Sequence, residues 1–410
     1  MSFIMNIRSV AKYESKILVR SWFFRIFTLL AVVFLGFFNF AMMLMEDNFG
    51  LWFAKSVSSN IPYLNLLLLN TGQAVVAVFL SSEFLKRDKK LDTSEVFYVR
   101  PLSNAEYVVG KIWGNLRVFL FLNLLVLAIV LAFNFMASGV TVDLPAYLVY
   151  FFLISIPTLI FIIGLSIFLM LLLKNQALTF ILLLGYIGLT LFYIQDKFYY
   201  LFDYMVYNLP LFKSTIVGFS NLELILNHRA IYFFAGLGFI FFTIFLFKRL
   251  PNARRSHYPW LFLSFCMFLL MVTAGFRHVR SILWEGEMRA LYTSINNKYV
   301  YEPKMAIDYY DISVEQKSET IRSVVGMEGT ALAASEVFIF CLNPGLRVEE
   351  VKDGEKSLNF KREEQILAVD FGRKIEKGDT ISFSVSYEGR INDDFCYLDI
   401  PEEVLQQPHD

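Results

Sequence analysis

The stretch Glu83–Lys111, EFLKRDKKLDTSEVFYVRPLSNAEYVVGK, joins two long apolar runs of the chain. Its first half is dense in Lys and Arg, and such clusters beside apolar spans stay on the cytoplasmic side of a membrane because moving them across is costly. The segment Val96–Val99 is apolar, Pro101 stops a helix, and Ser103 is a candidate N-cap for a short helix toward Lys111. A solvated loop that only sets membrane topology explains the charges but not the apolar centre.

The composition divides the chain into two parts. Of the 410 residues, 56% are hydrophobic, against about 45–50% in an average globular chain. Residues 1–275 are mostly apolar and residues 276–410 are polar and mixed. The net charge of zero gives no reason to expect nucleic acid as a partner. We therefore expect an α-helical polytopic membrane part, followed by a soluble part.

Seven apolar runs approach the length of about 20 residues that a membrane span needs. They are Trp22–Met45, Ile61–Leu85, Ile112–Phe135, Ala146–Leu173, Ala177–Ile194, Ile231–Phe247 and Trp260–Phe276. The fourth run contains Pro157 and Gly164 and is expected to kink. The first run is too long for the core of a cleaved signal peptide, so it is predicted to be a retained span.

The distribution of cations between these runs predicts the orientation. With the N-terminus in the cytoplasm, the inner connections hold the cations of segment 83–111 together with Arg8, Lys12, Lys16, Arg20, Lys174, Lys248, Arg249, Arg254 and Arg255. The outer connections then hold only Lys55, Lys197 and Lys213, with Arg229 at a boundary. An odd number of spans places the C-terminal part outside the cytoplasm, in a multi-pass protein of the cell (inner) membrane.

The stretch quoted above resembles the first cytoplasmic loop of type 2 ABC exporter permeases. The residues that carry the resemblance are Glu83, Arg87, Asp88, Thr93, Pro101, Ser103, Tyr107, Gly110 and Lys111. The resemblance covers residues 1–250. It implies a permease half that acts as a homodimer or heterodimer in membrane lipid and works with a separate ATPase subunit. The implied ATPase contacts are Glu83, Arg87, Asp88, Lys89, Lys90, Thr93, Phe97, Pro101, Ser103, Gly110 and Lys111.

Two further stretches have a place in that family's order of elements. In Asn6–Arg20 a cation recurs every four residues, which fits either a helix lying in the lipid headgroup layer or an ordinary charged leader. The resemblance favours an interfacial helix over residues 1–21. The aromatic stretch Gln195–Arg229 is too polar and too broken to span, and it fits either two short helices at the outer leaflet or a simple aromatic anchor.

From about Asn296 the hydrophobic period changes to two. Residues Ile381–Tyr387 alternate apolar and Ser, as in a half-buried strand, whereas Glu336–Leu342 is apolar on both faces, as in a central strand. Asp353-Gly354 is a hairpin signal, and Lys377–Asp379 is a second turn. These features predict an all-β sandwich over residues 295–410.

Residues 305–392 resemble the N-terminal β-domain of membrane alanyl aminopeptidases, which belong to the gluzincin family of zinc proteases. The matching residues are Tyr310, Asp311, Ile312, Phe340, Leu342, Asn343, Leu346, Val348, Val351, Gly354, Leu358, Phe360, Gly378, Tyr387 and Gly389. These are structural positions, so the resemblance implies a fold. The chain contains neither the zinc motif HExxH nor a phosphate-binding loop, so we expect no catalytic residues, metal or cofactor in it. The histidines, His228, His257, His278 and His409, are predicted to be loop or boundary residues.

Two alternatives to a permease stay open. In the first alternative, the chain is the membrane-anchored front half of an outer-facing zinc aminopeptidase. In the second, it is a membrane anchor that displays a β-sandwich. The predicted divisions are residues 1–21, 22–250 for a six-span unit, 251–294 for a seventh span and linker, and 295–410. Cys341 and Cys396 are expected to be buried reduced thiols, with a disulfide as the less favoured alternative.

Overall fold

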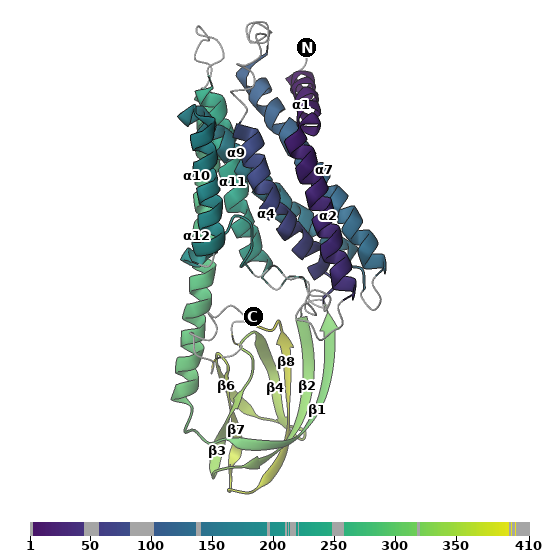
Figure 1. The fold of residues 1–410 in the computed structure, drawn as a ribbon. Coiled ribbons are helices and arrows are strands. Elements are labelled where there is room, and N and C mark those ends of the chain that lie inside the picture. Colours follow the sequence, from purple (N-terminus) through teal and green to yellow (C-terminus); the bar gives the residue numbers. More distant parts are fainter. Residues whose placement is uncertain are drawn as a thin grey trace. The chain divides into compact units, whose positions relative to one another are not determined.

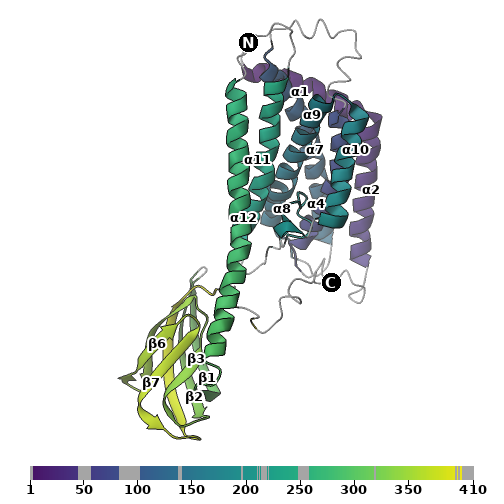
Figure 2. The ribbon, with the colours of Figure 1, turned by 90° about the vertical axis from the view of Figure 1, so that its left-hand side faces the viewer.

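The structure, a computed structural model, describes residues 3–44, 57–82, 102–136, 141–194, 197–209, 211, 213, 219, 221–247, 258–317, 320–392, 395 and 398. The chain divides into two compact units, Met1–Val279 and Arg280–Asp410. We call them the helical unit and the β unit and describe each by itself (Figures 1 and 2).

The helical unit is a bundle of long apolar helices. Its elements are α1 (Phe3–Arg20), α2 (Trp22–Leu44), α4 (Asn60–Ser82), α7 (Asn104–Met136), α8 (Leu144–Tyr150), the π-turn η1 (Phe151–Ser155), α9 (Ile156–Leu173), α10 (Gln176–Leu189), the π-turn η2 (Thr190–Ile194), the 3₁₀ turn η3 (Phe198–Tyr200) and α11 (Leu222–Leu246). The last helix, α12 (Tyr258–Lys298), begins in this unit, and its residues from Arg280 on belong to the β unit. Among the described residues, seven helical segments are long and apolar enough to cross a membrane. The prediction of seven apolar helices in this order is therefore confirmed.

Several helix boundaries differ from the expected ones. The helix predicted to run only from Ser103 to Lys111 continues without a break into the third apolar run, as the single helix α7. The last helix, α12, does not end near Phe276 but continues through the segment expected to be a linker. The fourth run contains the π-turn η1 just before Pro157, at the place where a kink was predicted.

The stretch between α10 and α11 was predicted less well. Of its described residues only Phe198–Tyr200 form a helical turn, and α11 already begins at Leu222. Phe198 and Tyr207 are exposed, as an aromatic anchor would be, but Tyr204 is fully buried. The two short interfacial helices are thus not found in the described part of this stretch, because its centre folds back between the long helices.

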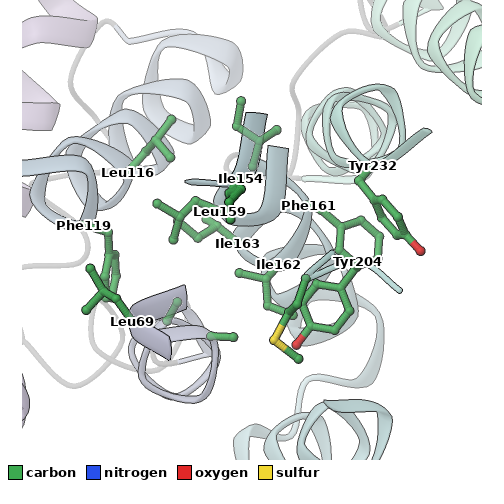
Figure 3. Packing of buried hydrophobic residues seen from close by; sticks show 14 of the residues in the cluster. Leu69, Leu116, Phe119, Ile154, Leu159, Phe161, Ile162, Ile163, Tyr204 and Tyr232 are labelled. Atoms are coloured by element: carbon green, nitrogen blue, oxygen red, sulfur yellow. The ribbon is translucent and has the colours of Figure 1, made fainter. Parts of the chain in front are cut away.

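The core of the helical unit surrounds α9. Figure 3 shows Phe161, Tyr204 and Tyr232 together near one side of this helix and Leu116 and Phe119 near another. Glycines bring α9 and α11 into close contact, because a Cβ added at Gly164 would lie 2.7 Å from the carbonyl oxygen of Gly236. Backbones in close contact through small residues are the usual way in which apolar helices associate.

The β unit contains two antiparallel sheets. Its strands are β1 (Met305–Lys317), β2 (Thr320–Ala331), β3 (Ser335–Cys341), β4 (Leu346–Asp353), β5 (Lys356–Ser357), β6 (Asn359–Glu363), β7 (Ile366–Ile375) and β8 (Thr380–Gly389). The order is β1-β2-β8-β4-β5 in one sheet and β3-β7-β6 in the other. Residues from both sheets, among them Val351 and Phe383 from the first and Phe338 and Val369 from the second, form one buried cluster. The predicted C-terminal β structure is confirmed.

Details of the β unit confirm some expectations and correct others. Gly354 takes a φ of +58° in the predicted hairpin between β4 and β5, and Gly378 takes +96° in the turn between β7 and β8. The strand predicted to be central, Glu336–Leu342, corresponds to β3 at the edge of the smaller sheet. Cys341 is a free, exposed cysteine and not a buried thiol. Cys396 lies outside the described residues.

Candidate functional site

Most of the predicted ATPase contacts lie outside the described residues. These are Glu83, Arg87, Asp88, Lys89, Lys90, Thr93, Phe97 and Pro101. The helix α4 ends at Ser82, directly before segment 83–101, and the next described residue is Leu102. Ser103, Gly110 and Lys111 are described, and they show how the C-terminal end of segment 83–101 is attached to the helical unit.

Ser103 caps α7 in a capping box. Its hydroxyl accepts from the amide of Glu106 at 3.1 Å, and the carboxylate of Glu106 accepts from the amide of Ser103 at 2.6 Å. Such reciprocal bonds satisfy two free donors at a helix N-terminus. The other carboxylate oxygen of Glu106 accepts from the side-chain amide of Asn6 on α1 at 2.8 Å. The start of α7 is therefore both capped and bonded to α1.

Gly110 and Gly114 let α1 approach α7 closely. A Cβ added at Gly110 would lie 2.7 Å from the Cβ of Val10, and one added at Gly114 would lie 2.7 Å from the Cβ of Glu14. Both contacts are shorter than real Cβ atoms make. The glycines are thus required by the close packing of two helices, and Gly110 is covered by α1.

Buried polar side chains hold the same contact together. The hydroxyl of Ser15 donates to the carbonyl of Gly114 at 2.7 Å and accepts from Nε of Arg117 at 2.5 Å. The ammonium of Lys111 lies 3.9 Å from the carboxylate of Glu14, and these side chains are 3% and 4% exposed. Lys111 therefore lies inside the contact between α1 and α7, where its side chain faces α1 and is shielded from other molecules.

A third helix joins this region. The side-chain amide of Asn104 donates to the carbonyl of Phe247, just beyond the end of α11, at 2.7 Å. The rings of Tyr107 and Phe247 stack with centroids 5.5 Å apart. We call the bonded contacts between α1, the start of α7 and the end of α11 the loop joint. It joins the residues that follow segment 83–101 to α1, the first helix, and to α11, a helix late in the unit's sequence.

A second polar region lies in the core and centres on Arg229. This side chain is 2% exposed, although the sequence placed it at a span boundary. Its guanidinium donates to the carbonyls of Leu153 at 2.7 Å, Tyr204 at 3.0 Å and Ile154 at 3.4 Å, and to the hydroxyl of Thr158 at 2.9 Å. A buried charge is tolerated only when its donors are satisfied in this way.

The need for such a donor follows from Pro157. In a regular helix the carbonyl of Leu153 would accept from the amide of residue 157, but proline has no N–H. The Nε of Arg229 takes that place. Arg229 thus repairs the defect that Pro157 and the π-turn η1 leave in the helix, and it links α11 to α9 and to Tyr204.

Asp203 lies in the segment between α10 and α11 and is also buried. Its carboxylate oxygens accept from the amides of Tyr207 at 2.9 Å and Asn208 at 2.8 Å. Burial raises the pKa of Asp203, while these amides and the nearby charge of Arg229 oppose the rise. The carboxylate therefore orders the turn that carries Tyr204 into the core.

Two histidines hold an unusual turn against the bundle. His228 on α11 and His278 on α12 are fully buried, so the prediction that they lie in loops or at boundaries is wrong. Their Nε2 atoms lie 2.9 Å and 2.8 Å from the carbonyls of Tyr200 and Tyr199. Because a carbonyl only accepts, each imidazole donates through Nε2–H. Phe198, Tyr199 and Tyr200 all have φ between +54° and +61°, a conformation that costs about 1–2 kcal/mol per residue.

Comparisons with known proteins add a partial structural likeness. The chain matches no protein-family model. It also matches no curated protein. Among solved structures it is similar to an M1 zinc metallopeptidase from Deinococcus radiodurans, a mutant bound to a Tyr-Ser-Ala substrate, with 17% identity and a TM-score of 0.20 over 21% of each chain.

The chain thus spans about a fifth of that metallopeptidase's length. A likeness of this extent carries no conclusion about fold or activity. Among the described residues, no group of three or more His, Cys, Asp or Glu side chains is placed to hold a metal ion. The resemblance of residues 1–250 to exporter permeases stays a prediction.

Proposed function

We propose that the chain is the transmembrane permease subunit of an ABC-type exporter that works with a separate ATPase subunit. In this proposal the seven apolar helices cross the cell (inner) membrane, the N-terminus is cytoplasmic and the β unit lies outside the cytoplasm. The concentration of Lys and Arg on one side supports this orientation. The chain is one of two permease halves. The separate ATPase subunit supplies the phosphate-binding loop that this sequence lacks.

The observation that carries the proposal is the loop joint. An exporter has to transmit the motion of a cytoplasmic ATPase into its membrane helices, and a flexible attachment would dissipate that motion. Here the residues that follow segment 83–101 are capped by Ser103, packed through Gly110 and bonded to α1 and α11. A displacement of the segment would therefore move three helices together.

The exposed face of α1 supports the proposed membrane position of this joint. Val10, Ala11 and Leu18 are buried, whereas Arg8, Lys12, Lys16 and Arg20 are exposed. A helix with such a basic face can lie in the headgroup layer beside anionic lipid. The α1 helix then supports the loop joint from the membrane surface, where an ATPase subunit would bind.

Co-purification of an ATPase subunit with a tagged full chain tests the proposal. We expect Phe97→Asp to reduce the amount of bound ATPase much more than Lys90→Ala does, at matched membrane levels. The reason is that a charge in an apolar contact is desolvated without a partner, whereas an exposed ion pair contributes only about 0–1 kcal/mol. Loss of the ATPase from Lys90→Ala with retention by Phe97→Asp would refute apolar docking.

A second variant separates binding from coupling. Gly110→Val should force α1 away from α7. We expect the variant still to bind the ATPase subunit, but the change in ATP hydrolysis rate that the permease causes should differ from that of the native chain. Gly36→Val is the matched control, because a Cβ at Gly36 meets no atom within 4 Å. If no ATPase subunit accompanies the unchanged chain from its native membrane, the proposed function is wrong.

A further inference from the structure

The wider sheet of the β unit is not fully covered by the narrower one. In the wider sheet Tyr310 pairs with Met327, and Ile312 pairs with Val325. Directly paired residues share a face of a sheet, and Val325 is buried on the face that packs against the second sheet. Tyr310 and Ile312 therefore point toward that same inner side, yet they are 52% and 57% exposed. An apolar row thus continues along β1 beyond the covered core.

A cavity of about 660 Å³ lies between this row and the edge of the smaller sheet, entirely within the β unit. We call it the β groove, and the lining residues that matter here are Lys304, Tyr310, Ile312, Ile339, Phe340 and Cys341. Its volume falls in the range of about 300–1,000 Å³ that small-molecule sites occupy. The lining is mostly apolar, with a few polar groups, which is the composition of a ligand site.

The charge of the lining is one-sided. Among the described residues that line it, Lys304 is the only cation and none carries a carboxylate. The ammonium of Lys304 donates to the carbonyl of Val300 at 2.8 Å and makes no ion pair within the described part of the chain. Lys304 directly precedes β1, and Ile312 lies eight positions farther along the extended chain, roughly 25 Å away. The groove is therefore elongated, with a cation toward one end and apolar side chains along its length.

The backbone at the edge of β3 argues against a paired strand as the occupant. A strand added to a sheet edge needs free backbone donors. The amide of Ile339 already donates to the carbonyl of Pro303 at 3.0 Å, and the amide of Val337 donates to the hydroxyl of Ser335 at 3.2 Å. The occupant that fits is an apolar chain that requires no hydrogen bonds along its length.

We propose that the β groove binds a single-chain amphiphile, with its acyl chain along the apolar row of β1 and an anionic carboxylate head at Lys304. The charge complementarity with Lys304 and the elongated apolar lining both select this chemistry over a neutral or compact ligand. The inference concerns binding by the β unit and does not depend on the permease role.

Cys341 supplies a native reporter, because its thiol lines the groove and is free. The assay uses the full chain in nanodiscs of zwitterionic lipid, with Cys266→Ser and Cys396→Ser, and follows the alkylation of Cys341 by iodoacetamide. Oleate is the probe and oleyl alcohol is its neutral counterpart. We expect saturating oleate to slow alkylation about tenfold. The concentration that gives half-maximal protection should be about fivefold higher for oleyl alcohol than for oleate. In Lys304→Ala the two probes should become equivalent.

Two matched variants separate the groove from general effects on the sheet. Ile312→Asp places a charge on the apolar row and should abolish protection by both probes. Val324→Asp makes the same kind of change on the opposite face of the sheet, at a residue that is 50% exposed, and should leave protection intact. Near-ultraviolet dichroism of each variant verifies that the β unit is folded.

Three results would overturn the proposal. The first is an alkylation rate that oleate leaves unchanged in the folded protein. The second is equal behaviour of Ile312→Asp and Val324→Asp. The third is protection of Cys341 by an extended peptide with alternating apolar residues but not by oleate, which would identify the groove as a strand-binding edge.

Discussion

Arg229→Met should destabilise the helical unit because it removes the donor that Pro157 cannot supply. The change deletes all the bonds from the guanidinium to Leu153, Ile154, Thr158 and Tyr204 and leaves the carbonyl of Leu153 without its donor at residue 229. The bonded partners of Arg229 are neutral, so the relevant cost is that of leaving a buried acceptor unsatisfied, about 1–3 kcal/mol. We expect a loss in this range in the free energy of unfolding.

A second substitution tests the cause of that loss. Pro157→Ala restores an N–H that can donate to the carbonyl of Leu153, so Arg229→Met should cost less in the Pro157→Ala background than in the native one. Interhelical hydrogen bonds measured in membrane proteins average about 0.6 kcal/mol, with a maximum of about 1.7 kcal/mol. The coupling between positions 157 and 229 should lie in this range, with the double variant more stable than the sum of the single effects.

The assay is equilibrium unfolding of the full chain in mild detergent by titration with sodium dodecyl sulfate, for the native chain, both single variants and the double variant. Independent sites usually add within about 0.3–0.5 kcal/mol. Additivity within that margin would show that Arg229 does not replace the donor missing at Pro157, and the explanation of the buried charge would fail.

Three further outcomes are expected. Gly114→Leu should separate α1 from α7 and lower the free energy of unfolding by about 1–3 kcal/mol, whereas Gly36→Leu, at an open position, should not, as the same titration would show. His228→Leu removes the donor to the strained turn at Tyr200, so chymotrypsin should cleave residues 198–204 faster than in the native chain; an unchanged rate would contradict the proposed role of the histidine. Partial burial raises the pKa of Cys341, so its alkylation rate should still be increasing with pH where that of a fully exposed cysteine has levelled off, which a rate profile against pH measures.

The order of elements could be predicted from the sequence because it depends on local properties. The length and hydropathy of each apolar run define the seven helices, and Gly354 and Gly378 mark turns that need a positive φ. The capping box Ser103-x-x-Glu106 was also readable, although only the serine was identified as a cap. These features depend on residues that are close in the sequence, so they can be predicted without knowing which elements pack against them.

The buried polar residues could not be predicted for the same reason. Arg229 was assigned to a boundary because polar residues interrupt the stretch before it, NLELILNH, and concealed the early start of α11. That its charge satisfies a carbonyl near Pro157 depends on packing between helices distant in sequence. The predicted helix end at Phe276 failed because the second half of α12 is polar.

The edge position of β3 has a similar origin. Its residues are apolar on both faces, which normally indicates a central strand. In the structure Ile339 and Phe340 line the β groove, so the apolar surface faces a cavity on the exposed side of an edge strand. The sequence pattern correctly indicated apolar surroundings on both faces of this strand. It cannot show whether a neighbouring strand or a groove provides them.

The proposed binding of an ATPase subunit at segment 83–101 is tested most directly by photocrosslinking. A photoreactive phenylalanine analogue placed at position 97 of the full chain is irradiated in native membranes, and the adducts are identified by mass spectrometry. We predict an adduct with an ATP-binding subunit, which weakens when that subunit is depleted. Adducts confined to lipid or to proteins outside the cytoplasm would contradict the permease assignment and the predicted orientation together.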